Sequence, residues 1–180
     1  MNLPTLTTAR LVLREPTLDD ADAVLRFRGD PEVQRFNDRT LADRGEAAEF
    51  LRAMAARSAA GHQRHWLITA HTDVVGMIGL HSWAPGHQRA ELGYDLARAQ
   101  WGHGYAVEAA RAVLAHGFGA MDLHRVEAYT IVDNVRSVRL LERLGFTREG
   151  TRRAYIREDD GRRYDSAVYG LLIGEGEGHG

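Results

Sequence analysis

Two glycines and an alanine stand at alternate positions in the segment from Trp101 to Ala106. The segment joins a strand-like run, Glu91 to Leu96, to a helix-like run, Val107 to Phe118. With so few side chains, the turn presents mainly backbone N–H groups. The first amides of a helix have no internal partner and its dipole favours negative charge, so such a turn can bind an anion. The spacing therefore indicates a phosphate-bearing ligand, or else a tight turn whose glycines only let a helix pack on a sheet.

Two well-known nucleotide-binding loops do not fit this turn. A Walker phosphate loop ends in Gly-Lys-Ser or Gly-Lys-Thr, which the chain lacks. A Rossmann fingerprint needs a third small residue where this chain has Val107, and the antiparallel strands expected before the turn are the wrong context for it. What remains is a turn that holds a pyrophosphate through its backbone alone, beside the simpler packing interpretation.

A second segment, from Asp133 to Phe146, gives the turn a more specific meaning. It reads Asp-Asn-Val-Arg-Ser-Val-Arg-Leu-Leu-Glu-Arg-Leu-Gly-Phe and follows the strand-like run Arg125 to Val132. Together with Leu92-Gly93-Tyr94 and the glycine turn, it strongly resembles the GCN5-related N-acetyltransferase (GNAT) family. The branch it resembles is that of the bacterial ribosomal-protein N-terminal acetyltransferases. The resemblance runs from about Ala9 to Leu172, nearly the whole chain.

The resemblance implies acetyl-coenzyme A (acetyl-CoA) as donor, with its pyrophosphate on the amides of the turn. The residues in this role are Trp101, Gly102, His103, Gly104, Tyr105 and Ala106. Trp101 replaces the Gln or Arg that is usual in the family, which leaves one polar contact unassigned. The pantetheine arm would lie where the strand-like runs 91–96 and 125–131 splay apart, and would pair with exposed backbone as an added strand does. Its backbone partners would be Tyr94, Asp95 and Leu96.

Direct acetyl transfer needs a neutral acceptor amine, and an α-amine has an ordinary pKa of about 7.7–8.0, so a modest base suffices. Glu91 borders the splay and is the expected base, acting directly or through water. The alternative is an exposed strand carboxylate paired with Arg89 or Arg125. The tetrahedral oxyanion would be stabilised by a backbone N–H at the splay.

The resemblance also places Asn134 against the pantetheine and Ser137 near the sulfur. Asn134 could instead cap the following helix. Many family members have a tyrosine general acid where this chain has Leu141, so the acid role passes to Ser137, to Tyr155 or to water. The high pKa of serine makes Ser137 better suited to donate a hydrogen bond to the leaving thiolate.

The elements that position these residues form an α/β fold in which a single GNAT-like domain covers residues 1–173. Hydrophobic periodicity and turn signals predict about seven strands in a mixed, mostly antiparallel sheet, splayed between the fourth and fifth, and about four helices. The predicted strands cover 11–13, 65–70, 74–80, 89–96, 125–132, 146–156 and 163–172. The predicted helices cover 17–28, 44–60, 107–118 and 134–144. The polar link 29–43 is the expected substrate loop, and the Gly-rich tail 174–180 is expected to be disordered.

The bulk composition sets limits on function. The chain has 180 residues, no cysteine and a net charge of −2, so a disulfide framework, a cysteine nucleophile and non-specific nucleic-acid or membrane binding are not expected. Its nine histidines are scattered without a metal-ligand pattern, so no metal site is expected. No apolar run approaches the roughly 18 residues of a membrane span, and no signal peptide is evident, so the expected location is the cytoplasm.

The leading hypothesis is therefore an acetyl-CoA-dependent N-acetyltransferase that works through a direct ternary complex. The acceptor would be a primary amine, such as the α-amine of a protein or peptide N-terminus. Two alternatives stay open: a non-catalytic acyl-CoA-binding sensor or scaffold, and an enzyme that acetylates a small-molecule amine such as an antibiotic. A homodimer is also compatible with the resemblance, since dimers are common among similar proteins.

Overall fold

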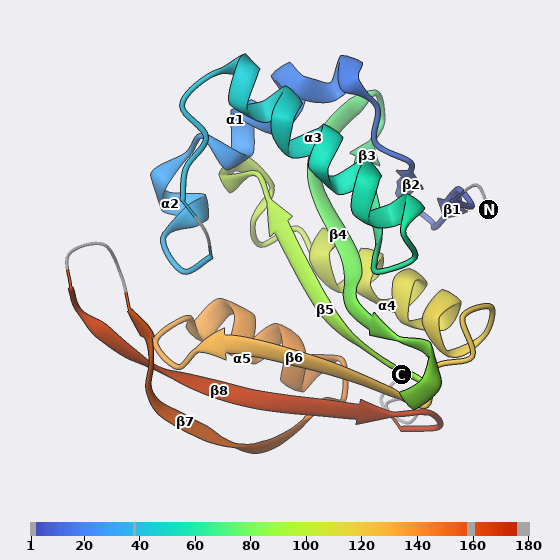
Figure 1. Ribbon diagram of the computed structural model, residues 1–180, viewed down its shortest axis with the longest axis vertical. Coiled ribbons are helices and arrows are strands. Elements are labelled where there is room, and N and C mark those ends of the chain that lie inside the picture. Colours follow the sequence, from blue (N-terminus) through green and yellow to red (C-terminus); the bar gives the residue numbers. More distant parts are fainter. Residues whose placement is uncertain (1–2, 38, 158–160, 176–180) are drawn as a thin grey trace.

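The computed structural model describes residues 3–37, 39–157 and 161–175. In this part of the chain, eight strands form one mixed sheet in the order β1-β2-β3-β4-β5-β6-β8-β7 (Figure 1). The strands are β1 (Leu6–Thr7), β2 (Leu11–Arg14), β3 (Arg64–Ala70), β4 (Asp73–Ala84), β5 (Arg89–Leu96), β6 (Arg125–Ile131), β7 (Thr147–Arg157) and β8 (Arg163–Leu172). The α-helices are α1 (Ala21–Arg28), α2 (Pro31–Gln34), α3 (Arg44–Ala59), α4 (Tyr105–Phe118) and α5 (Val135–Arg143). The predicted α/β fold with a mixed, mostly antiparallel sheet is confirmed.

Helices cover both faces of the sheet (Figure 1). Successive side chains of a strand point to opposite faces, so each strand contributes to two hydrophobic layers. Leu67 and Met77 pack with α1 and α3 on one face. Trp66 and Ile78, one residue away in the same strands, pack with Val113 of α4 on the other. This alternation tells us which residues of β4 and β5 face the α1/α3 side and which face the α4/α5 side.

The sheet opens between its two parallel strands. The paired residues of β5 and β6 are Arg89 with Arg125, Ala90 with Val126 and Glu91 with Glu127. Although β5 continues to Leu96 and β6 to Ile131, no pairing between them is found beyond Glu91 in the described residues. The predicted splay is therefore confirmed. The predicted fourth and fifth strands are β5 and β6 here, because β1 was not predicted.

The sequence does not predict two short elements. Strand β1 has 2 residues, which is too short to show an alternating pattern. Helix α2 lies inside the link 29–43 that was expected to be a loop. Asp30 begins this helix by accepting the N–H of Glu32, and Pro31 occupies its first position.

Strand β4 extends four residues beyond the predicted end at Leu80, to Ala84. A register shift against β5 lies between His81 and Ala84, and Ser82 has a φ of 49° there. A β-bulge of this kind lets a strand continue after a local bend and re-aims the side chains beside it. Just before this shift, His81 still pairs in register with Glu91 of β5.

No helix among the described residues is long and apolar enough to cross a membrane. Of the tail predicted to be disordered, residues 176–180 lie outside the described residues. Glu175 is described, and its carboxylate accepts the N–H of Leu172 at 2.9 Å. The domain boundary at residue 173 stays a prediction.

Candidate active site

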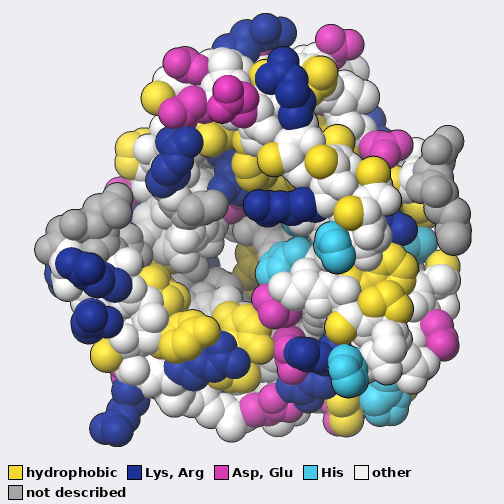
Figure 2. Space-filling view, viewed as in Figure 1, with side chains coloured by type: hydrophobic (Ala, Val, Ile, Leu, Met, Phe, Trp, Pro, Cys, Tyr) yellow, Lys and Arg dark blue, Asp and Glu magenta, His cyan; other side chains and the backbone are white. Residues whose placement is uncertain are grey.

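A cavity of about 780 Å³ lies where β5 and β6 splay apart. It is lined by the glycine turn, by β5 beyond Glu91, by β6 and α5, and by α2 with the residues that follow it. Its volume falls in the range of about 300–1,000 Å³ that is usual for ligand sites. Figure 2 shows a hollow in the middle of the α1/α3 face, with histidine and acidic side chains gathered along one side of it.

The glycine turn has a backbone that only glycine adopts easily. Gly102 and Gly104 have φ values of 82° and 80°, in the left-handed region. Gly104 is the N-cap residue of α4. Because glycine has no side chain, this N-cap makes no side-chain hydrogen bond to the first amides of the helix. The first amides of a 14-residue helix are therefore left for a ligand beside the cavity.

Trp101 joins this turn to both β5 and α5. Its indole N–H donates to the carbonyl of Leu96 at 2.8 Å, so this carbonyl, an expected pantetheine partner, already accepts one hydrogen bond. On its other side, the guanidinium carbon of Arg136 lies 4.1 Å from the centre of the Trp101 ring. Arg136 therefore brings a positive charge next to Trp101, the residue for which the sequence left a polar contact unassigned.

A second hollow, of about 640 Å³, lies beside the same turn. It is lined by several cationic side chains, among them Arg10, Arg111 and Arg143. The side chain of His103 is exposed and its ring stacks on Tyr105 with 5.8 Å between centroids. Arg10 also donates to the carbonyl of His103 at 2.9 Å, which tethers the turn to the N-terminal strands.

The start of α5 meets β5 on the α4/α5 side of the splay. Asn134 caps the helix, with its side-chain oxygen accepting the N–H of Ser137 at 3.3 Å. The hydroxyl of Ser137 lies 2.8 Å from that of Tyr94, and either can donate. Burial raises the pKa of Tyr94 to about 12, so its phenol keeps its proton at neutral pH. Leu141 is buried in the core.

Asp95 faces the α1/α3 side. Its carboxylate lies 2.6 Å from the guanidinium of Arg28 and accepts the side-chain amide of Asn37 at 2.5 Å. Both charged side chains are nearly buried, with 6% of Asp95 and 10% of Arg28 exposed. The side chain of Asp95 thus holds the loop after α2 against β5, and its backbone is the part that can meet a ligand.

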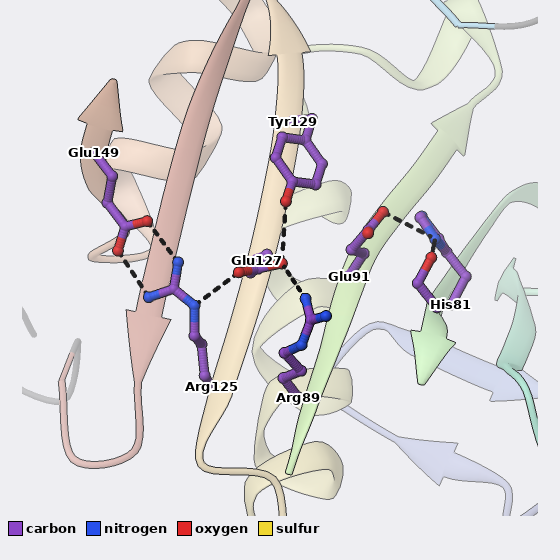
Figure 3. Close-up of polar contacts among 8 residues, drawn as sticks. His81, Arg89, Glu91, Arg125, Glu127, Tyr129 and Glu149 are labelled. Carbon is purple, nitrogen blue, oxygen red and sulfur yellow. Dashed lines mark hydrogen bonds and ion pairs between the residues drawn. The ribbon is translucent and has the colours of Figure 1, made fainter. Parts of the chain in front are cut away.

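Glu91 of β5 and Glu127 of β6 pair in register at the start of the splay, but their surroundings differ (Figure 3). Glu127 accepts hydrogen bonds from Arg125 at 2.9 Å, from Arg89 at 3.1 Å and from the Tyr129 hydroxyl at 3.0 Å. Arg125 also pairs with Glu149. The two arginines considered as partners of Glu91 are thus engaged with Glu127. Glu91 instead lies 3.4 Å from Nδ1 of His81, a contact that the sequence analysis does not anticipate.

His81 in turn stacks on His65 of β3, with ring centroids 6.2 Å apart and planes inclined by 3°. Burial, reinforced by the charges of His81, Arg28 and Arg57, lowers the pKa of His65 from its ordinary 6.5 to about 3. His65 is therefore neutral at any pH at which the protein would work. Its Nδ1 atom is buried and has no hydrogen-bond partner among the described residues.

This histidine should make folding stability depend on pH. Between pH 6.5 and about 3 the unfolded chain protonates His65 and the folded chain does not, so stability falls as the pH falls. We expect His65→Leu to flatten this dependence by up to about 1.4 kcal/mol per pH unit. Urea unfolding of both proteins between pH 4 and 7 measures the difference, with exposed His87→Leu as control. Equal slopes for wild type and His65→Leu would contradict the expectation.

The structure does not bring Tyr155 to the cavity. Its side chain is 61% exposed on β7 and stacks with Arg152, whose guanidinium carbon is 4.9 Å from the ring centre. The residues that line the cavity, within the described part of the chain, include Tyr129 instead. Alternation along β6 could have shown that Tyr129 and Glu127 share one face of the sheet.

A family model described as an acetyltransferase (GNAT) domain matches residues 10–147. The chain belongs to the GNAT acetyltransferase family. The uncharacterized N-acetyltransferase p20 of Bacillus licheniformis is 36% identical over 173 residues, which cover 94% of this chain and 97% of that protein. The putative ribosomal N-acetyltransferase YdaF of Bacillus subtilis is 35% identical over 105 residues, which cover 57% of this chain and 56% of that protein. A crystal structure of a putative acetyltransferase from T. thermophilus aligns with a TM-score of 0.81 and 33% identity, over 97% of this chain and 93% of that one.

This GNAT protein is thus an N-acetyltransferase that takes its acetyl group from acetyl-CoA and passes it to an amine. The chain's own geometry fits such a donor. The turn offers unpaired helix amides, arginines flank it, and the cavity continues into the splay. Among the described residues, no group of three or more His, Cys, Asp or Glu side chains could hold a metal ion.

Proposed function

We propose that this GNAT protein acetylates the α-amine of a protein or peptide N-terminus by direct attack in a ternary complex. The observation that carries the proposal is the splay, which opens one cavity between two chemically different sides of the sheet. The α4/α5 side has the open amides of the turn and a hydroxyl pair. The α1/α3 side carries the carboxylates of Glu91 and Glu127.

On the donor side, the amides from Trp101 to Ala106 bind the pyrophosphate, and the cations Arg136 and Arg143 add attraction for it. The pantetheine arm pairs with the backbone of β5 from Tyr94 to Leu96, since this stretch lacks β6 as a neighbour. Asn134 contributes through the cap that fixes the first turn of α5. Two short amide-rich surfaces thus hold the donor at its two ends.

We assign to Ser137 the role of stabilising the leaving thiolate with a hydrogen bond. A thiol has an ordinary pKa of about 8.5, so a hydrogen bond or a proton assists its departure. Either hydroxyl of this pair can be the donor, and we infer that Tyr94 donates to Ser137, which leaves the Ser137 proton free to hydrogen-bond the sulfur. Tyr94 keeps that proton at neutral pH because burial raises its pKa to about 12. The partly buried Tyr94, which bonds to Ser137, rather than the exposed Tyr155 is the tyrosine suited to this role.

On the acceptor side, the carboxylate of Glu91 attracts an ammonium group to the mouth of the splay, whereas Glu127 is already paired with Arg89 and Arg125. An α-amine needs only a modest base because its ordinary pKa is about 7.7–8.0, far below that of a lysine side chain at about 10.4. We assign proton removal to the Glu91 side of this pair. The similarity to YdaF, which is named a putative ribosomal N-acetyltransferase, supports an acceptor on a protein.

The test measures release of free thiol from acetyl-CoA with Ellman's reagent against a panel of amines. Peptides with a free α-amine are expected to accelerate release, whereas the same peptides with a blocked N-terminus and a free lysine are not. Acceleration only by polyamines or aminoglycosides would replace the proposal with a small-molecule acceptor. Acetyl-CoA binding by calorimetry without acceleration by any amine would replace it with a non-catalytic binding module.

A further inference from the structure

The α1/α3 face of the sheet carries two adjoining rows that meet at the splay. In one row, His65 of β3 pairs in register with Gly79 of β4, and Gly79 with Gly93 of β5. In the next row, His81 pairs with Glu91. A Cβ atom at Gly79 would collide with the His65 ring, and one at Gly93 would lie 3.0 Å from Nε2 of His81. The two glycines therefore form a floor on which the stacked imidazoles lie flat.

This floor decides how the His81 ring is presented. Its Nδ1 lies 3.4 Å from the Glu91 carboxylate and 3.3 Å from the Ser82 hydroxyl. A proton on Nδ1 therefore points at acceptors, and the neutral ring keeps its lone pair on Nε2. Nε2 lies over Gly93, which lines the cavity, and 37% of the His81 side chain is exposed. A base is thus directed at the splay from the acceptor side.

We propose that Nε2 of His81 takes the proton from the acceptor amine and that Glu91 is the positioning residue that orients His81. The inference rests on the proposed function and identifies the general base of that reaction. The N–H bond of the ammonium breaks and a bond from Nε2 to that proton forms. The electron pair left on the amine nitrogen forms the C–N bond to the acetyl carbon, and the carbonyl π pair moves to the oxygen. The C–S bond then breaks with its electron pair on the sulfur, which Ser137 hydrogen-bonds, and the second proton of the nitrogen passes to that sulfur, so the products are the amide, the thiol and protonated His81.

The neighbouring charges suit this assignment. Burial lowers the pKa of His81 and the charge of Glu91 raises it, so the ring is neutral before the reaction and its cation is stabilised after proton uptake. His65, from β3, stays neutral, and the cations that act on it are Arg28 of α1 and Arg57 of α3. Arg28 is itself paired with Asp95.

Glu127 is less suited to take the proton. Burial would raise its pKa, but hydrogen bonds from Arg125 and Tyr129 outweigh that effect and lower it. Its two oxygens accept three hydrogen bonds from Arg125, Arg89 and Tyr129 (Figure 3). Glu127 therefore stays ionised and engaged, whereas the imidazole of His81 has a lone pair near neutral pH.

The experiment measures kcat/KM for the best peptide acceptor in His81→Ala, His81→Gln, Glu91→Gln and the double variant His81→Ala/Glu91→Gln. Loss of a general base lowers the rate by about 10²–10⁴-fold, so His81→Ala and His81→Gln should both fall in this range. Glu91→Gln should cost less, and the double variant no more than His81→Ala alone, because Glu91 acts through His81. Exposed His87→Ala is the control and should keep wild-type activity.

Chemical rescue separates a base from a packing residue. Added imidazole should restore activity to His81→Ala, with a rate that depends on the pKa of substituted imidazoles, and should leave Glu91→Gln unchanged. Acetyl-CoA binding by calorimetry should stay at the wild-type level in all variants. Wild-type rates in His81→Gln, or a loss in His81→Ala without rescue, would overturn the assignment of His81. If wild-type protein acetylates no amine, the proposed function itself fails, which is a different outcome.

Discussion

Gly104→Val is expected to raise the dissociation constant for acetyl-CoA by at least about 100-fold, which corresponds to about 2.7 kcal/mol. Gly104 has a φ of 80°, a conformation that costs an L-residue roughly 1–2 kcal/mol, and a β-branched side chain tolerates it least. If the turn relaxes to relieve this strain, the amides that start α4 change direction. If it does not, the valine stands over them. Both responses remove the anion site, and calorimetric titration with acetyl-CoA measures the loss.

Gly61→Val provides the matched control. Gly61 follows α3, has a φ of 79°, and a Cβ atom there would meet nothing within 4 Å. It carries the same backbone strain as Gly104, but it lines neither hollow in the described structure. Both variants should therefore lose similar thermal stability, and Gly104→Val alone should lose affinity. Unchanged acetyl-CoA affinity in folded Gly104→Val would remove the turn as the pyrophosphate site.

The donor side of the site follows from local sequence. Gly102 and Gly104 have a left-handed backbone, a conformation that glycine adopts more easily than any other residue. The spacing of these glycines in the sequence is therefore enough to predict the turn. Asn134 and Ser137 are three residues apart and therefore share one face of the helix that they begin. The strands and helices around them have clear periodicity, and the observed bounds of α5 and β6 lie within one or two residues of those predicted.

The acceptor side depends on contacts between strands that no local pattern encodes. His81 reaches Glu91 because β4 continues past Leu80 in unbroken register with β5, and the register shifts only between His81 and Ala84. The sequence pattern that ends at Leu80 does not show this extension. Arg89 lies two residues before Glu91, and Arg125 lies two residues before Glu127, so sequence spacing alone does not decide which glutamate each arginine contacts. Their choice of Glu127 is decided by strand register and side-chain direction. Tyr155 looks suitable by type alone, but the β7 position leaves its side chain in solvent.

Asp95→Ala is expected to lower folding stability by about 3–5 kcal/mol, because breaking a buried ion pair leaves the remaining charge desolvated. Asp95 pairs with Arg28 at 2.6 Å, with 6% and 10% of the two side chains exposed. For a chain of this size the loss corresponds to roughly 6–20 °C in Tm. The same carboxylate accepts the amide of Asn37, so the loop after α2 should loosen and KM for the peptide acceptor should rise. Differential scanning calorimetry and acceptor titrations measure the two effects.

Asp22→Ala separates burial from charge. Asp22 pairs with Arg44 at 3.1 Å, but 65% and 62% of these two side chains are exposed. An exposed pair contributes only about 0–1 kcal/mol, so this variant should unfold near the wild-type temperature.

Asp95→Asn adds a second comparison, because it removes the charge and keeps an oxygen that can still accept from Asn37. If Asp95→Asn restores KM for the acceptor but not Tm, then the loop is held by the hydrogen bond and the fold by the ion pair. Equal Tm values for Asp95→Ala and Asp22→Ala would contradict a stabilising role of the buried pair.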